Sequence, residues 1–277
     1  MNNLTRRNFI TGTAALAAMA GLAACGSAST GSSDTSSSAS TSTADYTLVT
    51  SGTLTCIAEL GFAPFEYMDE STGEAKGFDI DVANAIAEKM GLTCTFLPNQ
   101  KFDTLVPTIK QGGKADIAIS GITINDERAK EIDFTDPYVD SNQSLVVLAT
   151  SNDSSSTLNV AGKKIACQAG TTGEEWIQEN MPNVTCVPLD DVAAAMTGVQ
   201  TGLYDGFVID LPVSSNLITK SFTDLKVAEK IPTGEQYGIA VSKDNPGLTA
   251  AINDALAKIK SDGTMDDLET TWFGSTI

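Results

Sequence analysis

Residues 117–128 combine the side chains and the backbone freedom that a carboxylate-binding site needs. The segment starts as an apolar strand, passes through Ser120, Gly121 and Thr123, and then reaches Arg128. A guanidinium group donates two parallel hydrogen bonds to a carboxylate, and α/β proteins bind ligands beyond the carboxyl ends of their buried strands. The segment therefore predicts a site for a small anionic or zwitterionic ligand.

The composition excludes several classes of site. The chain of 277 residues has no histidine, which rules out Ser-His-Asp triads, Cys-His pairs and His-ligated zinc. Its net charge of −18 opposes binding to phosphate backbones and anionic lipid. We expect no metal, no cofactor and no nucleic acid partner. A cleft built from Arg, Asp and Glu also lacks a group that ordinarily titrates between about pH 5 and 8, which predicts nearly constant ligand affinity there.

The start of the chain has the pattern of an export signal. Arg6 and Arg7 precede an Ala-rich segment that is too short to cross a bilayer, and they fit the twin-arginine route while the general route stays open. Residues 22–26 resemble the lipobox of bacterial lipoproteins, in which the cysteine is lipidated. We therefore expect residues 1–24 to be a signal peptide and residues 25–45 to be lipidated Cys25 with a flexible tether, which anchors the protein outside the cytoplasm on the cell membrane.

The rest of the chain contains an approximate duplication. Strands at residues 54–58 and 164–167 each start a β-α-β-α-β series, and Gly-x-x-Asp precedes the third strand at residues 113–116 and 202–205. Series of this kind form mainly parallel sheets that are flanked by helices. The predicted fold class is therefore α/β with two lobes.

The end of the chain supplies a further strand at residues 238–241 and an amphipathic helix at residues 248–259. Both complete the first lobe, so the chain must leave that lobe, build the second and return. We expect lobe 1 to comprise residues 46–142 plus 236–277, lobe 2 to comprise residues 143–235, and a ligand cleft to lie between the two lobes.

Four polar residues follow predicted strands, two of them in each lobe: Glu59, Ser120, Gln168 and Asp210. Ligands of open α/β sheets bind beyond the carboxyl ends of the strands. These residues are far apart in the sequence, yet we expect them to meet in one cleft.

Several motifs resemble those of the polar amino-acid-binding proteins of bacterial ABC importers, which have a two-lobed periplasmic-binding fold of type II. The resemblance covers residues 48–274 and depends on Phe62-Ala63-Pro64-Phe65-Glu66, Gly77-Phe78-Asp79-Ile80-Asp81, Ile119-Ser120-Gly121-Ile122-Thr123-Ile124 with Glu127-Arg128, Asp133-Phe134-Thr135-Asp136-Pro137-Tyr138, Gly170-Thr171-Thr172, Asp262-Gly263-Thr264 and Trp272-Phe273-Gly274. It implies a monomeric receptor that captures a free amino acid and delivers it to the transmembrane subunits of an ABC permease. The alternatives are a dehydratase-like enzyme on the same scaffold, with Glu59 as its acid or base, and a subunit that presents ligand to a membrane sensor.

The resemblance also implies how the two charged groups of an amino acid would be bound. Arg128 and Thr123 would hold the α-carboxylate from lobe 1, while the backbone amides of Thr171 and Thr172 would hold it from lobe 2. The α-ammonium would be bound by a separate set of acceptors: Asp210, Ser120 and the carbonyl of Gly121.

The remaining residues that the resemblance implies would contact the ligand side chain. Phe62 and Phe102 would cover its aliphatic part, and Glu59 and Gln168 would face its polar end. A carboxylate and an amide at that end favour arginine, lysine, ornithine or glutamine, leave histidine and cystine open, and disfavour acidic ligands.

Several of these residues also fit a structural role. Asp210 and Arg128 fit an ion pair between lobes, Phe62 and Phe102 fit the core, and Glu59 fits a solvated loop. Two further predictions concern the starts of helices. We expect Asp79 and Asp81 to be helix-capping and surface residues, and residues 172–175 to form a capping box.

The cysteines of each lobe fall on neighbouring predicted strands, Cys56 with Cys94 and Cys167 with Cys186. Neighbouring parallel strands hold their side chains in a geometry poorly suited to a disulfide, which predicts free thiols, although an exported location favours oxidation. No Cys-x-x-Cys spacing supports a metal site.

Overall fold

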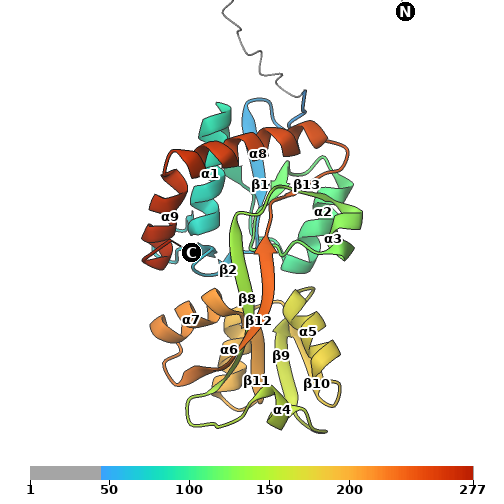
Figure 1. The fold of residues 1–277 in the computed structure, drawn as a ribbon, viewed down its shortest axis with the longest axis vertical. Coiled ribbons are helices and arrows are strands. Elements are labelled where there is room, and N and C mark those ends of the chain that lie inside the picture. The colour runs from blue at the N-terminus through green and yellow to red at the C-terminus, as the bar shows by residue number, and fades with distance from the viewer. Residues whose placement is uncertain (1–44, 277) are drawn as a thin grey trace, which may run out of the picture. The chain divides into compact units, whose positions relative to one another are not determined.

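A computed structural model describes residues 45–276, so the predicted signal peptide, Cys25 and all but the last residue of the predicted tether lie outside the described part of the chain. The described residues contain two five-stranded sheets and one small three-stranded sheet (Figure 1). No helix in this part of the chain is long and apolar enough to span a membrane.

The first large sheet has the strand order β5-β1-β6-β13-β7. Strand β1 pairs in parallel with β5 and β6, whereas β13 is antiparallel to both of its neighbours. The strands are β1 (Thr53–Ile57), β5 (Thr93–Phe96), β6 (Ile117–Ala118), β7 (Asp133–Phe134) and β13 (Ala240–Val241). We call this sheet and its helices lobe 1, and the helices are α1 (Phe78–Met90), η1 (Phe102–Thr104), α2 (Leu105–Gln111), α3 (Asp126–Glu131), α8 (Pro246–Ser261) and α9 (Thr264–Phe273). The small sheet joins β2 (Gly61–Phe62), β3 (Glu66–Met68) and β4 (Ala75–Lys76).

The second large sheet repeats this arrangement with the order β10-β9-β11-β8-β12. Strand β9 is parallel to β10 and β11, and β8 is antiparallel to β11 and β12. The strands are β8 (Val139–Leu148), β9 (Lys164–Gln168), β10 (Thr185–Leu189), β11 (Gly206–Asp210) and β12 (Leu225–Tyr237). We call this sheet lobe 2, together with α4 (Ser155–Leu158), α5 (Thr172–Asn180), α6 (Val192–Gln200) and α7 (Leu211–Lys220). The prediction of a two-lobed α/β fold with mainly parallel sheets is confirmed.

The local sequence of helix α1 explains where this helix begins and ends. It starts after Gly77, whose φ of 137° is open to glycine, and an added Cβ there would lie 2.0 Å from the carbonyl oxygen of Phe65. Its apolar residues at helical spacing are buried, and it ends at Gly91 in the left-handed conformation with φ 71°. The expected helix at residues 248–259 is α8, which begins two residues earlier and buries Leu248, Ile252, Ala255, Leu256 and Ile259.

Strands β8 and β12 connect the two lobes. They pair antiparallel over a long stretch, from Val139 opposite Tyr237 to Leu148 opposite Leu225. The lobe boundaries that the sequence predicts, at residues 142/143 and 235/236, fall inside these two strands. At the lobe 1 end, the backbone of Tyr237 and its neighbours bonds to the segment after β6, through Ile124 N to Gln236 O and Gly238 N to Ile122 O.

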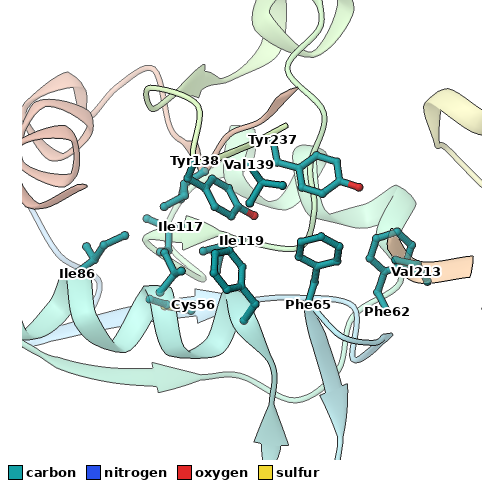
Figure 2. Close-up of a cluster of buried hydrophobic side chains, with 14 of the residues drawn as sticks. Cys56, Phe62, Phe65, Ile86, Ile117, Ile119, Tyr138, Val139, Val213 and Tyr237 are labelled. Atoms are coloured by element: carbon teal, nitrogen blue, oxygen red, sulfur yellow. The ribbon is translucent and has the colours of Figure 1, made fainter. Parts of the chain in front are cut away.

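A buried aromatic group lies where the crossing strands meet lobe 1 (Figure 2). The ring of Phe65 contacts that of Tyr237 with centroids 5.3 Å apart, and Tyr138 lies 6.5 Å from Tyr237. Phe62 is 6% exposed and stacks 6.1 Å from Phe65. The hydrophobic core therefore extends to Phe62, which was predicted from the sequence to contact the ligand.

The four cysteines in the described part of the chain are free thiols, as predicted. Their sulfur atoms nevertheless approach closely, at 3.6 Å for Cys56 and Cys94 and 3.4 Å for Cys167 and Cys186. Each pair is diagonal in its sheet, because Cys94 is in register with Leu54 and Cys186 is in register with Ile165.

Two local predictions are wrong. Asp79 does not cap α1 or lie on the surface, since its side chain is fully buried and makes no capping bond. Only Asp81 keeps some exposure, and it accepts a hydrogen bond of 2.8 Å from the indole of Trp272. The capping residue of α5 is Thr171 rather than Thr172, because the Thr171 hydroxyl accepts from Glu174 N at 3.3 Å.

Candidate functional site

The four polar residues predicted at strand ends are all buried. Glu59 follows β1, Ser120 follows β6, Gln168 ends β9 and Asp210 ends β11, with exposures of 6%, 1%, 4% and 7%. Buried polar groups need partners or a ligand, so the contacts of each residue determine what the site can bind.

Arg128 joins the loop after β6 to the loop after β9. Asn125 caps the short helix α3 by accepting a hydrogen bond from Arg128 N at 2.8 Å. The Arg128 guanidinium donates to Thr123 O at 2.8 Å and to Gly170 O at 3.0 Å, and it lies 5.3 Å above the ring of Phe102. Burial lowers the pKa of Arg128 from its ordinary value, but a guanidinium stays charged at any physiological pH. A carboxylate in place of these neutral carbonyl acceptors would form a charge-assisted pair.

The start of α5 provides the lobe 2 side of the same subsite. The Thr171 hydroxyl donates to Gln168 O at 2.7 Å and so holds the turn that precedes the helix. The first amides of a helix have no partner within the helix and carry partial positive charge. The amides of Thr171 and Thr172 are therefore in a suitable place to bind an anion.

Glu235 is a residue of this region that the sequence did not predict. Its Oε2 accepts from the hydroxyls of Thr123 at 3.1 Å and Thr172 at 3.2 Å, and from the side-chain amide of Gln143 at 3.1 Å. Glu235 thus connects threonines of both lobes. A cavity of about 370 Å³ beside them is lined by Thr123, Thr172, Glu235 and Trp176 among others.

Asp210 is held by the crossing strands. The hydroxyl of Tyr237 donates to Asp210 Oδ1 at 2.5 Å, and that of Ser141 lies 3.5 Å from the same oxygen. Burial, followed by the negative charge of Glu235, raises the pKa of Asp210 to about 7, while hydrogen bonds from Tyr237 and Gln143 oppose that rise. No ion pair between Asp210 and Arg128 forms among the described residues.

Glu59 and Gln168 meet beyond the carboxyl ends of β1 and β9, where their side chains share a hydrogen bond. Burial raises the pKa of Glu59 to about 7, against the opposing effect of a hydrogen bond from Gln168. Glu59 is only 6% exposed, which excludes a solvated loop acid, and its Oε2 has no hydrogen-bond partner within residues 45–276. Gln168 also donates to Asp190 O at 3.4 Å. The two raised carboxyl pKa values predict that affinity changes with pH near neutrality, in contrast to the constant affinity that the composition predicts, because desolvation can bring a carboxyl group into that range without a histidine.

The two predicted aromatic residues occupy different environments. Phe62 belongs to the same cluster of buried core residues as Val213 (Figure 2). Gly121 has a φ of 53°, and an added Cβ would lie 3.1 Å from Phe62 and 3.4 Å from Tyr237. Phe102 is only half-buried and packs on the lobe 1 core beneath Arg128. Both rings therefore lie beside residues that are predicted to bind the charged groups of the ligand.

The residues that the sequence missed are on the crossing strands: Ser141, Gln143, Glu235 and Tyr237. The sequence did indicate that the chain crosses twice between lobes. All four residues lie close to the predicted crossing points at 142/143 and 235/236, so a search for polar residues near those points would have identified them.

Comparison with known proteins identifies the family. Residues 54–275 match the bacterial extracellular solute-binding proteins, family 3. The ABC transporter arginine-binding protein 1 of Escherichia coli (strain K12) is 37% identical over 217 residues, which is 76% of this chain and 87% of that protein. The L-cystine-binding protein TcyJ of the same strain is 30% identical over 227 residues, which is 82% of this chain and 84% of that protein. The structure of an ancestral arginine-binding protein bound to glutamine is 37% identical, with a TM-score of 0.75 and coverage of 82% of this chain and 100% of that one.

These matches extend over most of the described residues and include the segments that carry the site. They also agree with a two-lobed periplasmic-binding-protein fold. The chain therefore belongs to family 3 of the bacterial extracellular solute-binding proteins, a family of binding proteins.

Proposed function

We propose that this protein captures a free polar or basic amino acid between its two lobes and delivers it to the permease of an ABC importer. The observation that carries the proposal is the distribution of charge in the cleft. Arg128 and the start of α5 fit an α-carboxylate, and Asp210 with Ser120 and Gly121 fits an α-ammonium. The names of relatives that bind arginine and cystine support an amino acid ligand.

The side-chain end of the cleft favours a ligand with hydrogen-bond donors. Glu59 has a buried oxygen without a partner in the described part of the chain, and Gln168 lies beside it. A guanidinium, ammonium or amide group would satisfy that oxygen, whereas a second carboxylate would repel it. Arginine, lysine, ornithine and glutamine are therefore the proposed ligands.

A thermal-shift screen against the free amino acids tests this proposal. A ligand at 100 times its Kd adds about 2.7 kcal/mol to the stability of the folded state, which raises the Tm of a protein of this size by about 5–10 °C. We expect such a shift with at least one of arginine, lysine, ornithine and glutamine, and none with glutamate or aspartate. Stabilisation by acidic amino acids alone, or by no amino acid, would refute the proposed ligand class.

We also propose that lipid on Cys25 anchors the protein to the outer face of the cell membrane. The Cys25→Ser variant should leave an unprocessed precursor and shift the protein out of the lipid-modified fraction, because a serine hydroxyl cannot take the thioether-linked lipid. Mass spectrometry of the membrane fraction measures both effects. Ser27→Ala is the matched control and should be processed normally. Normal lipidation of Cys25→Ser protein would contradict the proposal.

A further inference from the structure

Two carboxyl groups that no ligand role explains are fully buried behind the Ser120–Gly121 segment. Glu66, the first residue of β3, and Asp79, in the first turn of α1, are both 0% exposed. Their side chains lie within hydrogen-bond reach of each other. One oxygen of each, Glu66 Oε2 and Asp79 Oδ1, has no donor from any other described residue.

Two carboxylates cannot both stay ionised at close range in a dry core. Burial and the neighbouring Asp79 charge raise the pKa of Glu66 well above its ordinary value, and burial raises that of Asp79 to about 6. Asp79 accepts from Gly121 N and from the hydroxyl of Tyr138, which favours its charged form, whereas the charges that face Glu66 are those of Asp79 and Glu59. One proton held by Glu66 and donated to Asp79 satisfies both unpaired oxygens and leaves the pair with a single negative charge.

The hydrogen bonds that Glu66 and Asp79 accept from Ser120 and Gly121 determine how these two residues can act at the predicted ammonium subsite. Ser120 Oγ donates its only proton to Glu66 Oε1 at 2.7 Å and accepts from Glu59 N at 3.0 Å. The hydroxyl has no second proton to donate, so it can contact a ligand only as an acceptor. The amide of Gly121 donates to Asp79 Oδ2 at 2.9 Å, which holds the peptide in its positive-φ conformation next to Tyr237.

From these contacts we infer that Glu66 and Asp79 are positioning residues for the ligand's α-ammonium. They share one proton, keep Ser120 and Gly121 oriented as acceptors, and add one buried negative charge behind them. This inference rests on the proposed function, because it assigns the ammonium subsite to Ser120, Gly121 and Asp210.

Amide substitutions test the sharing of one charge. In Glu66→Gln the amide oxygen still accepts from Ser120 and the NH₂ replaces the shared proton, while Asp79 stays ionised. In Asp79→Asn the roles reverse, and Glu66 ionises. Each single variant keeps one negative charge and should lose only about threefold in affinity for L-arginine or L-glutamine. The double variant has no charge at this position, and its affinity should fall about thirtyfold or more, which exceeds the product of the two single losses.

A second ligand separates positioning from general damage. The double variant should bind the α-hydroxy analogue of arginine, which lacks the ammonium, about as well as wild type does. Equal losses for arginine and this analogue, or additive losses in the double variant, would overturn the inference. Glu88→Gln is the matched control, because Glu88 is an exposed acid on the same helix α1 and should bind arginine like wild type.

A measurement without ligand examines the shared proton itself. Infrared spectroscopy of the ligand-free protein at about pH 8, above the ordinary carboxyl range, should show a protonated carboxyl that disappears in either single amide variant. Persistence of that band in both variants would overturn the shared proton. A wild-type protein that binds no amino acid would instead refute the proposed function, so the two failures can be told apart.

Discussion

The Arg128→Ala variant is expected to lose measurable amino acid binding while the protein stays folded. The guanidinium of Arg128 is held between Thr123 O and Gly170 O and is the cation next to the α5 N-terminus. Truncation of one partner of a buried charge pair costs about 2–5 kcal/mol, which is a loss of about 30-fold to several thousandfold in affinity. Calorimetric titration with the amino acid found in the ligand screen measures this loss.

Two matched variants make the Arg128 experiment specific. Arg128→Lys keeps the charge but loses the planar fork, so it should recover only part of the affinity. Lys130→Ala removes a cation from the exposed face of the same helix α3 and should bind within about twofold of wild type, since its partner Glu127 is also exposed. Arg128→Ala binding within tenfold of wild type would show that the α-carboxylate is bound elsewhere.

The Asp210→Asn variant is expected to lose affinity and, with L-glutamine as the ligand, the pH dependence of binding. The substituted amide would retain the hydrogen bond from Tyr237 but would no longer neutralise the α-ammonium, which again costs about 2–5 kcal/mol. Asp140→Asn is a suitable control, because Asp140 is an exposed acid on the crossing strand β8. Its affinity should match that of wild type, and equal affinity of Asp210→Asn would show that Asp210 does not bind the ammonium.

The direction of the wild-type pH profile follows from the raised pKa. With a pKa of about 7, Asp210 is mostly protonated in the free protein at pH 6 and mostly ionised at pH 8. An ammonium binds the ionised form, so affinity for L-glutamine should rise about tenfold from pH 6 to pH 8 and then level off. For L-arginine the rise should be steeper, because Glu59, whose pKa is also about 7, must ionise to pair with the side chain.

Titration calorimetry across this pH range distinguishes the two acids. Asp210→Asn should flatten the glutamine profile, and Glu59→Gln should reduce the additional slope with arginine while leaving the glutamine slope in place. A wild-type profile that is flat for both ligands would mean that neither carboxyl is protonated near neutral pH in the free protein.

The sequence by itself determined the fold class and the polar residues at the ends of the buried strands. The strand expected at residues 54–58 is β1 (Thr53–Ile57), and that expected at 164–167 is β9 (Lys164–Gln168). These predictions succeed because apolar periodicity and glycine positions are local properties of the chain. A polar residue at the end of a parallel strand also has a predictable location, since parallel strands of one sheet end at the same edge.

Only the tertiary structure decided which of these residues share hydrogen bonds and which carboxyl groups are protonated. Tyr138 reaches Asp79 across 59 positions, and Glu235 reaches Thr123 across 112, so no local pattern connects them. Asp79 was predicted on the surface because an acid at a helix start ordinarily faces water, whereas packing against lobe 1 buries it completely. The pKa values near 7 of Glu59 and Asp210 have the same origin, because desolvation depends on what surrounds a carboxyl in space and not on its neighbours in sequence.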